Sequence, residues 1–168
     1  MAWRGMETVM ILAIDPGSEQ SAYVLYDPTI AWIGLFGILS NGEMCDTLQS
    51  VIAAPASILV IEQIGHYGTG MPAGKTVFDT CIWIGRFLQA WDGPYELVPV
   101  KTWRAQLCGS ARAKDGNARQ ALIDRFGAPG TKKNPGKLYG VKKDVWQALG
   151  LAVAYGDTHD VVVYDSGS

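Results

Sequence analysis

The sequence of 168 residues has few cysteines, two histidines and no long apolar run. The three cysteines, Cys45, Cys81 and Cys108, are odd in number and far apart, which argues against a disulfide framework and against a cysteine-ligated metal. No stretch approaches the ~20 apolar residues that a membrane span needs. The apolar run at 9–14 is also too short for the core of a signal peptide. These absences predict a single soluble domain spanning 1–168 that works in a reducing, cytoplasmic compartment, away from membranes.

Charge is also scarce overall, but it is unevenly distributed. Charged residues make up 18% of the chain and the formal net charge is -2. Residues 101–143 nevertheless contain 11 of the 14 basic residues and only the acids Asp115 and Asp124, a local charge of about +9. This asymmetry predicts a surface that binds nucleic-acid phosphates, the alternative being an ordinary solvated basic face. The residues expected to contact DNA in this stretch are Lys101, Arg104, Arg112, Lys114, Arg119, Lys132, Lys133 and Lys137.

The hydrophobic pattern predicts an α/β fold. Strands are expected at 9–14, 21–26, 30–39, 57–64 and 95–100, and helices at 44–54, 75–91, 116–126 and 144–155. The runs 9–14 and 57–64 are almost continuously apolar, as in central strands, and 144–155 is apolar nearly all round, as in a buried helix. The segment 130–139 is a loop of Gly, Lys and Pro, expected to be mobile until an anion binds. This order predicts a mixed sheet with helices on both faces.

Three acids stand at the ends of predicted elements. Asp15 follows the strand 9–14, Glu62 interrupts the apolar strand 57–64, and Asp144 opens the last helix. If the two strands are neighbours, Asp15 and Glu62 are like charges side by side, which favours a cation between them. A hard divalent ion such as Mg²⁺ prefers carboxylate oxygens. Each acid also has a structural alternative: Asp15 could cap the Asp-Pro-Gly turn, Asp144 could cap its helix, and Glu62 could pair with an arginine.

These residues resemble a known family. Ile-Asp-Pro-Gly at 14–17, Ile-Glu-Gln at 61–63 and an acid before an Ala-rich last helix resemble the RuvC-like Holliday-junction resolvases. The blocks 83–91, 107–127, 130–144 and 145–157 are more specifically similar to the bacteriophage branch, and the resemblance covers about 10–157. It implies a ribonuclease-H-like (retroviral-integrase-type) fold and a Mg²⁺-dependent crossover junction endodeoxyribonuclease that cleaves four-way junctions during phage DNA recombination or branch removal.

The resemblance also implies roles for single residues. Asp15, Glu62 and Asp144 would hold two Mg²⁺ ions, which Mn²⁺ can replace, and these would hydrolyse the phosphodiester bond. The family has a second acid three residues into the last helix, where this chain has Gln147. An amide oxygen can ligate a cation but carries no charge, or Gln147 could bond only to backbone; Lys143 is a further auxiliary candidate at the phosphate.

By the same resemblance, the loop after Glu62 would enter the DNA. In it Tyr67 is a candidate for stacking on a base, Lys75 for a phosphate contact and His66 for proton transfer, although Tyr67 could instead be a surface aromatic. Because a four-way junction takes two symmetric cuts, a homodimer is expected. Its predicted interface is the helix 75–91, through Ile82, Trp83 and Phe87.

Three other functions compete with this prediction. A junction-binding protein could have weak or lost cleavage because of Gln147. A less selective branched-DNA nuclease could have the same fold. An actin-like ATPase or sugar kinase also places Asp-x-Gly after a strand, but it needs a second domain and a second Gly-rich loop, for which this chain is too short.

Overall fold

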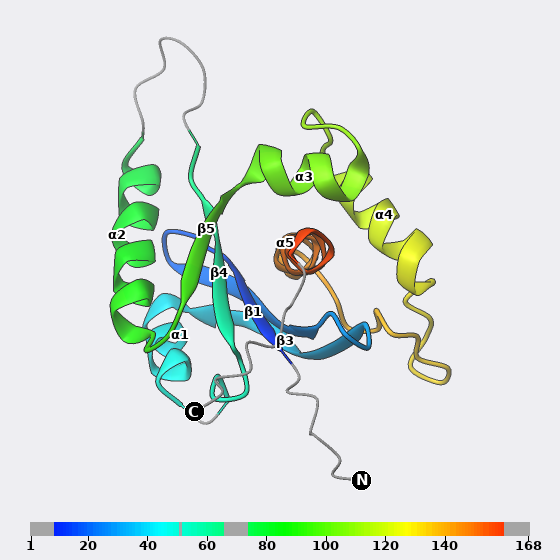
Figure 1. Cartoon of the computed structure of the whole chain (residues 1–168), viewed down its shortest axis with the longest axis horizontal. Helices are drawn as coiled ribbons and strands as arrows, with labels where there is room; N and C mark the ends of the chain where they lie inside the picture. The colour runs from blue at the N-terminus through cyan, green and yellow to red at the C-terminus, as the bar shows by residue number, and fades with distance from the viewer. Residues whose placement is uncertain (1–8, 51, 66–73, 160–168) are drawn as a thin grey trace, which may run out of the picture.

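A five-stranded mixed sheet forms the centre of the molecule (Figure 1). The computed structural model describes residues 9–50, 52–65 and 74–159. In the order β3-β2-β1-β4-β5, β1 pairs antiparallel with β2 and parallel with β4, which pairs parallel with β5. The strands are β1 (Ile11–Asp15), β2 (Gln20–Asp27), β3 (Trp32–Ser40), β4 (Ile58–Gln63) and β5 (Tyr95–Pro99). All five strands were predicted from the sequence.

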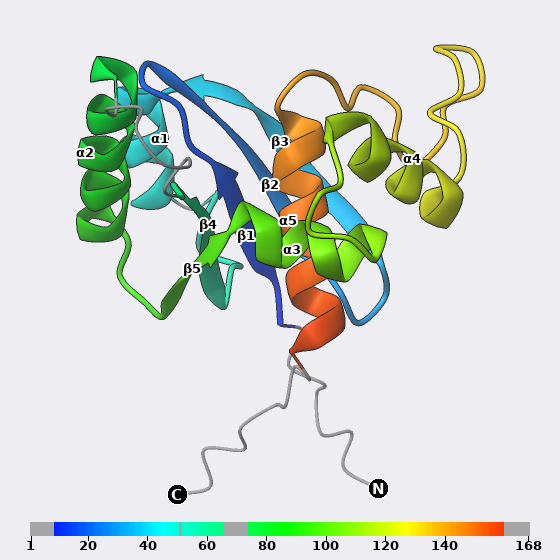
Figure 2. The same cartoon turned by 90° about the horizontal axis from the view of Figure 1, so that it is seen from above.

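Helices cover both faces of this sheet (Figures 1 and 2). They are α1 (Asn41–Leu48), α2 (Lys75–Ala90), α3 (Val100–Cys108), α4 (Asp115–Phe126) and α5 (Val145–Thr158). Helices α1 and α2 lie on one face, and α5 lies on the other, with α3 and α4 packed outside it. The predicted mixed α/β sheet with helices on both faces is confirmed. None of the helices described here is long and apolar enough to cross a membrane.

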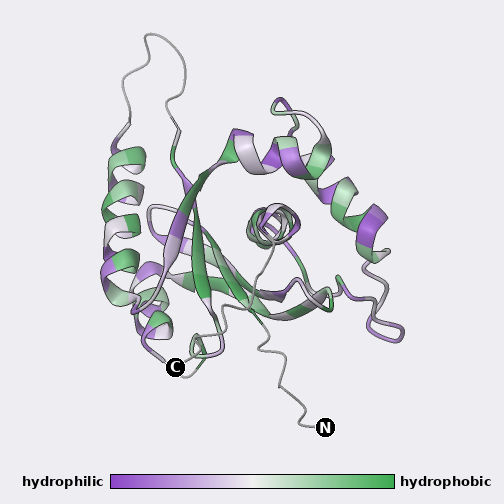
Figure 3. Cartoon of the chain, in the orientation of Figure 1, coloured by the Kyte–Doolittle hydropathy of each residue, from purple (hydrophilic) through white to green (hydrophobic). Residues whose placement is uncertain are grey.

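Alternation along β1 sends side chains into two separate cores. Ile11 and Ala13 pack in the core that contains α5, whereas Leu12 and Ile14 pack in the core that contains α1 and α2. Both faces of β1 are therefore apolar, which explains its continuous hydrophobic run; Figure 3 shows β1 and β4 in the hydrophobic colour. The period of two continues to Asp15, which places this residue on the α5 side of the sheet.

Two elements differ from the sequence prediction. The helix expected at 44–54 is α1, which begins at Asn41 because Ser40 and Glu43 form a reciprocal capping box, and it ends at Leu48 before a turn at 52–55. Helix α3 was not predicted at all. It starts directly after Pro99, and its short length and weak apolar periodicity gave little signal beside the basic residues around it.

The lysine-rich loop at 130–139 is a folded turn. Gly130 and Pro135 form a β-bridge, the Gly136 amide donates to the Pro129 carbonyl at 2.8 Å, and Leu138 is fully buried. The backbone that carries the exposed lysines of this loop is therefore held in place by the β-bridge and by the buried side chain of Leu138.

Candidate active site

Asp15 and Glu62 lie side by side at the carboxyl ends of two central strands. Ile14 of β1 is in register with Ile61 of parallel β4, so the two acids follow as the next neighbours. Val60 belongs to the α5-side core, and alternation puts Glu62 on that same side. The strand pairing therefore presents two carboxylates from adjacent strands toward α5, at the edge where parallel α/β sheets bind ligands.

The turn after Asp15 is fixed by polar contacts that do not use its carboxylate. The Gly17 amide donates to Ser21 Oγ at 3.1 Å, Ser21 Oγ donates to Asn41 Oδ1 at 2.6 Å, and Asn41 Nδ2 donates to the Gly17 carbonyl at 2.9 Å. A Cβ on Gly17 would lie 2.3 Å from the Gln20 carbonyl oxygen, so only glycine fits here. Ser21 and Asn41 thus hold the turn, which leaves Asp15 for another role than capping it.

Glu62 is oriented by a buried tryptophan. Trp103 of α3 donates from its indole Nε1 to Glu62 Oε2 at 2.8 Å, and its ring is fully buried. The ring packs against Gly150 of α5, where an added Cβ would lie 2.8 Å from Trp103 Cζ3. No role at this site was predicted for Trp103 from the sequence, because Glu62 and Trp103 are 41 residues apart in the chain.

Burial and mutual repulsion disfavour the ionised forms of the two acids. Burial, followed by the charges of Glu62 and Asp144, raises the pKa of Asp15 from 3.8 to about 8. Burial also raises the pKa of Glu62, while the Trp103 hydrogen bond and the Arg104 charge lower it. Because the ionised pair is disfavoured on its own, a divalent cation would be a suitable partner, and carboxylate oxygens are the ligands that Mg²⁺ prefers.

Asp144 stands at the N-cap of α5 without capping it through its side chain. The residue before it, Lys143, has a left-handed backbone with φ of 49°, which an ordinary side chain rarely adopts. The Asp144 charge contributes to the raised pKa of Asp15, so the third acid lies within electrostatic reach of Asp15. Within the described parts of the chain, however, no three His, Cys, Asp or Glu side chains are close enough together to enclose a metal. The carboxylate oxygens suit a hard cation, and Asp15 and Glu62, which strand pairing holds in place, form the fixed part of a site for it.

Gln147 does not extend freely toward the acids. Its Oε1 accepts a hydrogen bond at 3.0 Å from Nη2 of Arg104, which also forms an ion pair with Asp115. Arg104 Nη1 donates to the Ala113 carbonyl at 3.1 Å. Arg104 was predicted to contact DNA, but its guanidinium is turned inward and only 19% of its side chain is exposed. Asp115 was not predicted as a site residue, because its sequence surroundings suggested only a basic stretch.

The other predicted DNA contacts are mostly exposed. Lys75 is exposed and forms an ion pair with Asp79. His66 and Tyr67 lie outside the described residues. The exposed basic residues of the 101–143 stretch are Lys101, Arg112, Lys114, Arg119, Arg125, Lys132, Lys133, Lys137, Lys142 and Lys143, of which Arg125 forms an ion pair with Asp157.

An open cavity of about 450 Å³ lies between the N-termini of α4 and α5. Its lining residues are Asp115, Gly116, Arg119, Val141, Lys142, Lys143, Asp144, Trp146 and Gln147. The guanidinium of Arg119 lies over the Trp146 ring, 4.9 Å from its centroid. The cavity therefore combines acidic side chains, suited to a cation, with basic side chains, suited to a phosphate.

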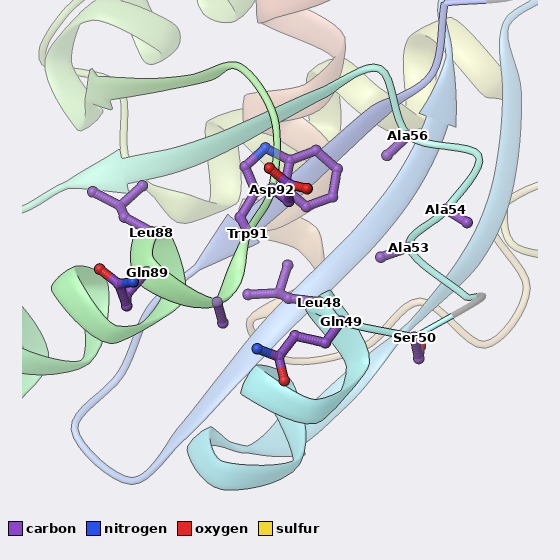
Figure 4. Close-up of a pocket in the computed structure, with 11 residues that line it drawn as sticks. Leu48, Gln49, Ser50, Ala53, Ala54, Ala56, Leu88, Gln89, Trp91 and Asp92 are labelled. Atoms are coloured by element: carbon purple, nitrogen blue, oxygen red, sulfur yellow. The ribbon is translucent and has the colours of Figure 1, made fainter.

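A larger cavity of about 790 Å³ lies at the opposite edge of the sheet (Figure 4). It is bordered by the end of α1, the segment before β4 and the end of α2, including Leu48, Ala56 and Trp91. These residues precede β4 and β5, whereas the acids follow β1 and β4. This cavity is therefore separate from the acid pair.

Comparison with known proteins identifies the fold as the ribonuclease-H-like class. No family model and no curated protein matches the sequence. Two solved structures of Thermus thermophilus RuvC are similar to this chain, each at 13% identity, covering 87% of this chain and 92% of that chain. Their TM-scores are 0.64 and, for RuvC in complex with a Holliday junction substrate, 0.67. The chain therefore has the fold of RuvC, as its sequence resemblance implied.

Proposed function

We propose that this chain is a divalent-metal-dependent endodeoxyribonuclease that cleaves four-way DNA junctions. The observation that carries the proposal is the pair Asp15 and Glu62, placed side by side by adjacent parallel strands and half-buried, with burial raising both pKa values and the Glu62 charge raising that of Asp15 further. The RuvC fold supports it, and one of the similar structures is a complex of RuvC with a Holliday junction substrate. The basic surface beside the acids supports DNA as the partner.

In this proposal the chain's own residues position the cation and the phosphate. Asp15, Glu62 and Asp144 would hold Mg²⁺ or Mn²⁺, which when bound activates water and stabilises the leaving oxygen of the scissile phosphate. Trp103 keeps a Glu62 oxygen in one orientation through its indole. Lys142, Lys143 and Arg119 line the neighbouring cavity and would neutralise phosphate charges of the bound DNA.

A homodimer would present two acid sites to one junction. On α2, Phe78 and Ile82 are four residues apart and remain 59% and 62% exposed, so together they form an apolar face. Of the three predicted interface residues, Ile82 belongs to this face, Trp83 is half-buried and Phe87 is fully buried. The prediction for Phe87 was wrong, because this ring fills the core between α2 and the sheet. A second copy of the chain is the occupant we propose for the exposed face.

The decisive experiment compares cleavage of synthetic four-way, three-way and linear duplex DNA with Mg²⁺, with Mn²⁺ and with chelator. We expect metal-dependent cleavage of the four-way substrate, and we expect D15N, E62Q and D144N to abolish cleavage while retaining DNA binding. D124N is the matched control, because Asp124 is an exposed acid of α4 that accepts a hydrogen bond from Gln120. If D15N and E62Q cleave normally, the acid pair is not the active site.

A second candidate is a junction-binding protein that does not cleave. The neutral Gln147 and its bond to Arg104 favour this candidate, since the site has lost one acid relative to the family it resembles. Tight, selective binding of the four-way junction without any metal-dependent nick would support it. Equal cleavage of all three substrates would instead indicate a less selective nuclease. A role in phage recombination or branch removal is part of the proposal and follows from the sequence resemblance alone.

A further inference from the structure

Arg104 of α3 connects two helices whose N-termini border the acid site. Its Nη1 donates to the Ala113 carbonyl just before α4, and its Nη2 contacts both Asp115 of α4 and Gln147 of α5. Its Nε is buried and, among the described residues, is the one buried side-chain nitrogen or oxygen without a hydrogen-bond partner. Arg104 therefore joins three segments that approach each other only in the folded chain.

These contacts bear on the acid that Gln147 replaces. The oxygen that Gln147 would offer to a cation, Oε1, is already the acceptor of the Arg104 hydrogen bond. On the other side of the same guanidinium is a full carboxylate, that of Asp115. The carboxylate that the family has on α5 is replaced here by Gln147, but the neighbouring helix α4 offers the carboxylate of Asp115. The Arg104 guanidinium contacts both side chains.

Asp115 is well placed to act on the acid site but is weakly held. It is the first residue of α4 and lines the same cavity as Asp144 and Gln147. Its charge also raises the pKa of both Asp15 and Glu62, so it lies within electrostatic reach of the acid pair. Its side chain is 76% exposed, and the ion pair with Arg104 is the contact that fixes it. Without that contact, this exposed carboxylate would be free to turn into solvent.

We propose that Arg104 is a positioning residue that holds Asp115 at the rim of the acid site, where Asp115 supplies the fourth carboxylate absent at Gln147. This inference rests on the proposed metal site at Asp15 and Glu62. The planar guanidinium is required, because it contacts Ala113, Asp115 and Gln147 at once, which the single ammonium of a lysine cannot reproduce.

Metal binding without DNA tests this inference independently of cleavage. Free Mn²⁺ is measured by electron paramagnetic resonance during titration of the whole chain and of D115N, R104K and R104Q, with D124N as the matched control. We expect D115N to weaken Mn²⁺ binding about tenfold, as for residues that support metal ligands, and D124N to leave it unchanged. Equal affinity of D115N and the parent would exclude Asp115 from the site.

The two arginine variants separate positioning from simple charge. If Arg104 acts only as a positive charge, R104K leaves the affinity unchanged and R104Q tightens Mn²⁺ binding, because a repelling charge is lost. If Arg104 positions Asp115, both variants weaken binding by about threefold or more, since Asp115 is released. Tighter binding by R104Q would therefore overturn the proposal. Circular dichroism and thermal unfolding establish that each variant is folded before titration.

A rescue and a reference variant complete the design. Adding Q147E to D115N places an acid on the other side of Arg104, and we expect it to restore most of the lost Mn²⁺ affinity. If it does not, a carboxylate at position 147 cannot replace the one at position 115, which contradicts the proposal. D15N is the reference for the proposed function. If D15N also leaves Mn²⁺ binding intact, the metal site itself is wrong; if D15N abolishes binding while D115N and R104K have no effect, only the present inference fails.

Discussion

Replacing Asp15 with asparagine should stabilise the metal-free protein. Burial and the neighbouring acids raise the pKa of Asp15 from 3.8 to about 8, so the folded chain tolerates the ionised carboxylate poorly. A difference of about 4 pH units at about 1.4 kcal/mol each gives an upper limit of about 6 kcal/mol above pH 8. Relaxation and water around a site at the sheet edge reduce this penalty, and we expect a measured gain of about 2 kcal/mol for D15N at pH 8.5.

The gain should depend on pH with a definite sign. Between about pH 4 and pH 8 the folded state retains a proton on Asp15 that the unfolded chain has released. The folded state of the parent protein therefore loses stability as the pH rises through this window, and the loss is complete above about pH 8. In D15N this titration is absent, so the two stability curves should meet near pH 4 and diverge as the pH rises.

Urea unfolding at pH 4, 5, 6, 7 and 8.5, with chelator present, measures this difference directly. If Asp15 is a metal ligand as proposed, adding Mg²⁺ at pH 8.5 should reverse the order, because Mg²⁺ bound only by the folded parent stabilises it while D15N lacks that carboxylate. Parallel curves for the two proteins across the whole range would refute the view that Asp15 is strained by burial. E96Q is a suitable control, since Glu96 is a partly buried acid that accepts a hydrogen bond from Tyr155 outside the acid site.

Three further outcomes are expected. G150A should lower cleavage more than it lowers stability, because the added methyl displaces Trp103 and breaks its hydrogen bond to Glu62. Measurements of kcat and of the urea midpoint for G150A and the parent check this. If G150A cleaves as fast as the parent, Glu62 does not need the support of Trp103. Neutralising Lys132 and Lys133 together should flatten the log–log salt dependence of junction binding by about 0.9 per lost phosphate contact, and an unchanged slope would leave them as ordinary surface charges. I82E should convert a dimer to a monomer in analytical ultracentrifugation, whereas I52E, at another exposed isoleucine, should not; a parent protein that is already monomeric contradicts the interface on α2.

The sheet and the strand acids could be predicted because their signals are local. Continuous apolar runs with an acid at the carboxyl end identify β1 and β4 directly, and the parallel register of Ile14 with Ile61 then brings Asp15 beside Glu62. The prediction of α5 was correct for the same reason, because its sequence is apolar on every face. Helix α1 was placed too late because its start depends on the capping box of Ser40 and Glu43, not on apolar periodicity.

The contacts around the strand acids could not be predicted, because each joins residues far apart in the chain. Trp103 is 41 residues from Glu62, and Arg104 is 43 residues from Gln147. Nothing in the sequence distinguishes Arg104 from the exposed basic residues near it, and all of them suggested DNA binding. Only the packing of α3 against α5 shows that this arginine is turned inward. Phe87 was misjudged for a related reason, since a helix with apolar residues on several faces does not show which face the sheet covers.

The acid site consists of a rigid part and an adjustable part, and this division has a consequence for metal binding. Asp15 and Glu62 are fixed by strand pairing, by the Ser21 and Asn41 bonds to the Gly17 turn and by Trp103. Asp144 and Asp115 instead stand on exposed helix N-termini that border an open cavity. In the proposed metal site, a cation shared by these acids would tie the helix acids to the strand acids. Metal binding should therefore protect the amides at the starts of α4 and α5 from hydrogen exchange while leaving those of β1 and β4 unchanged.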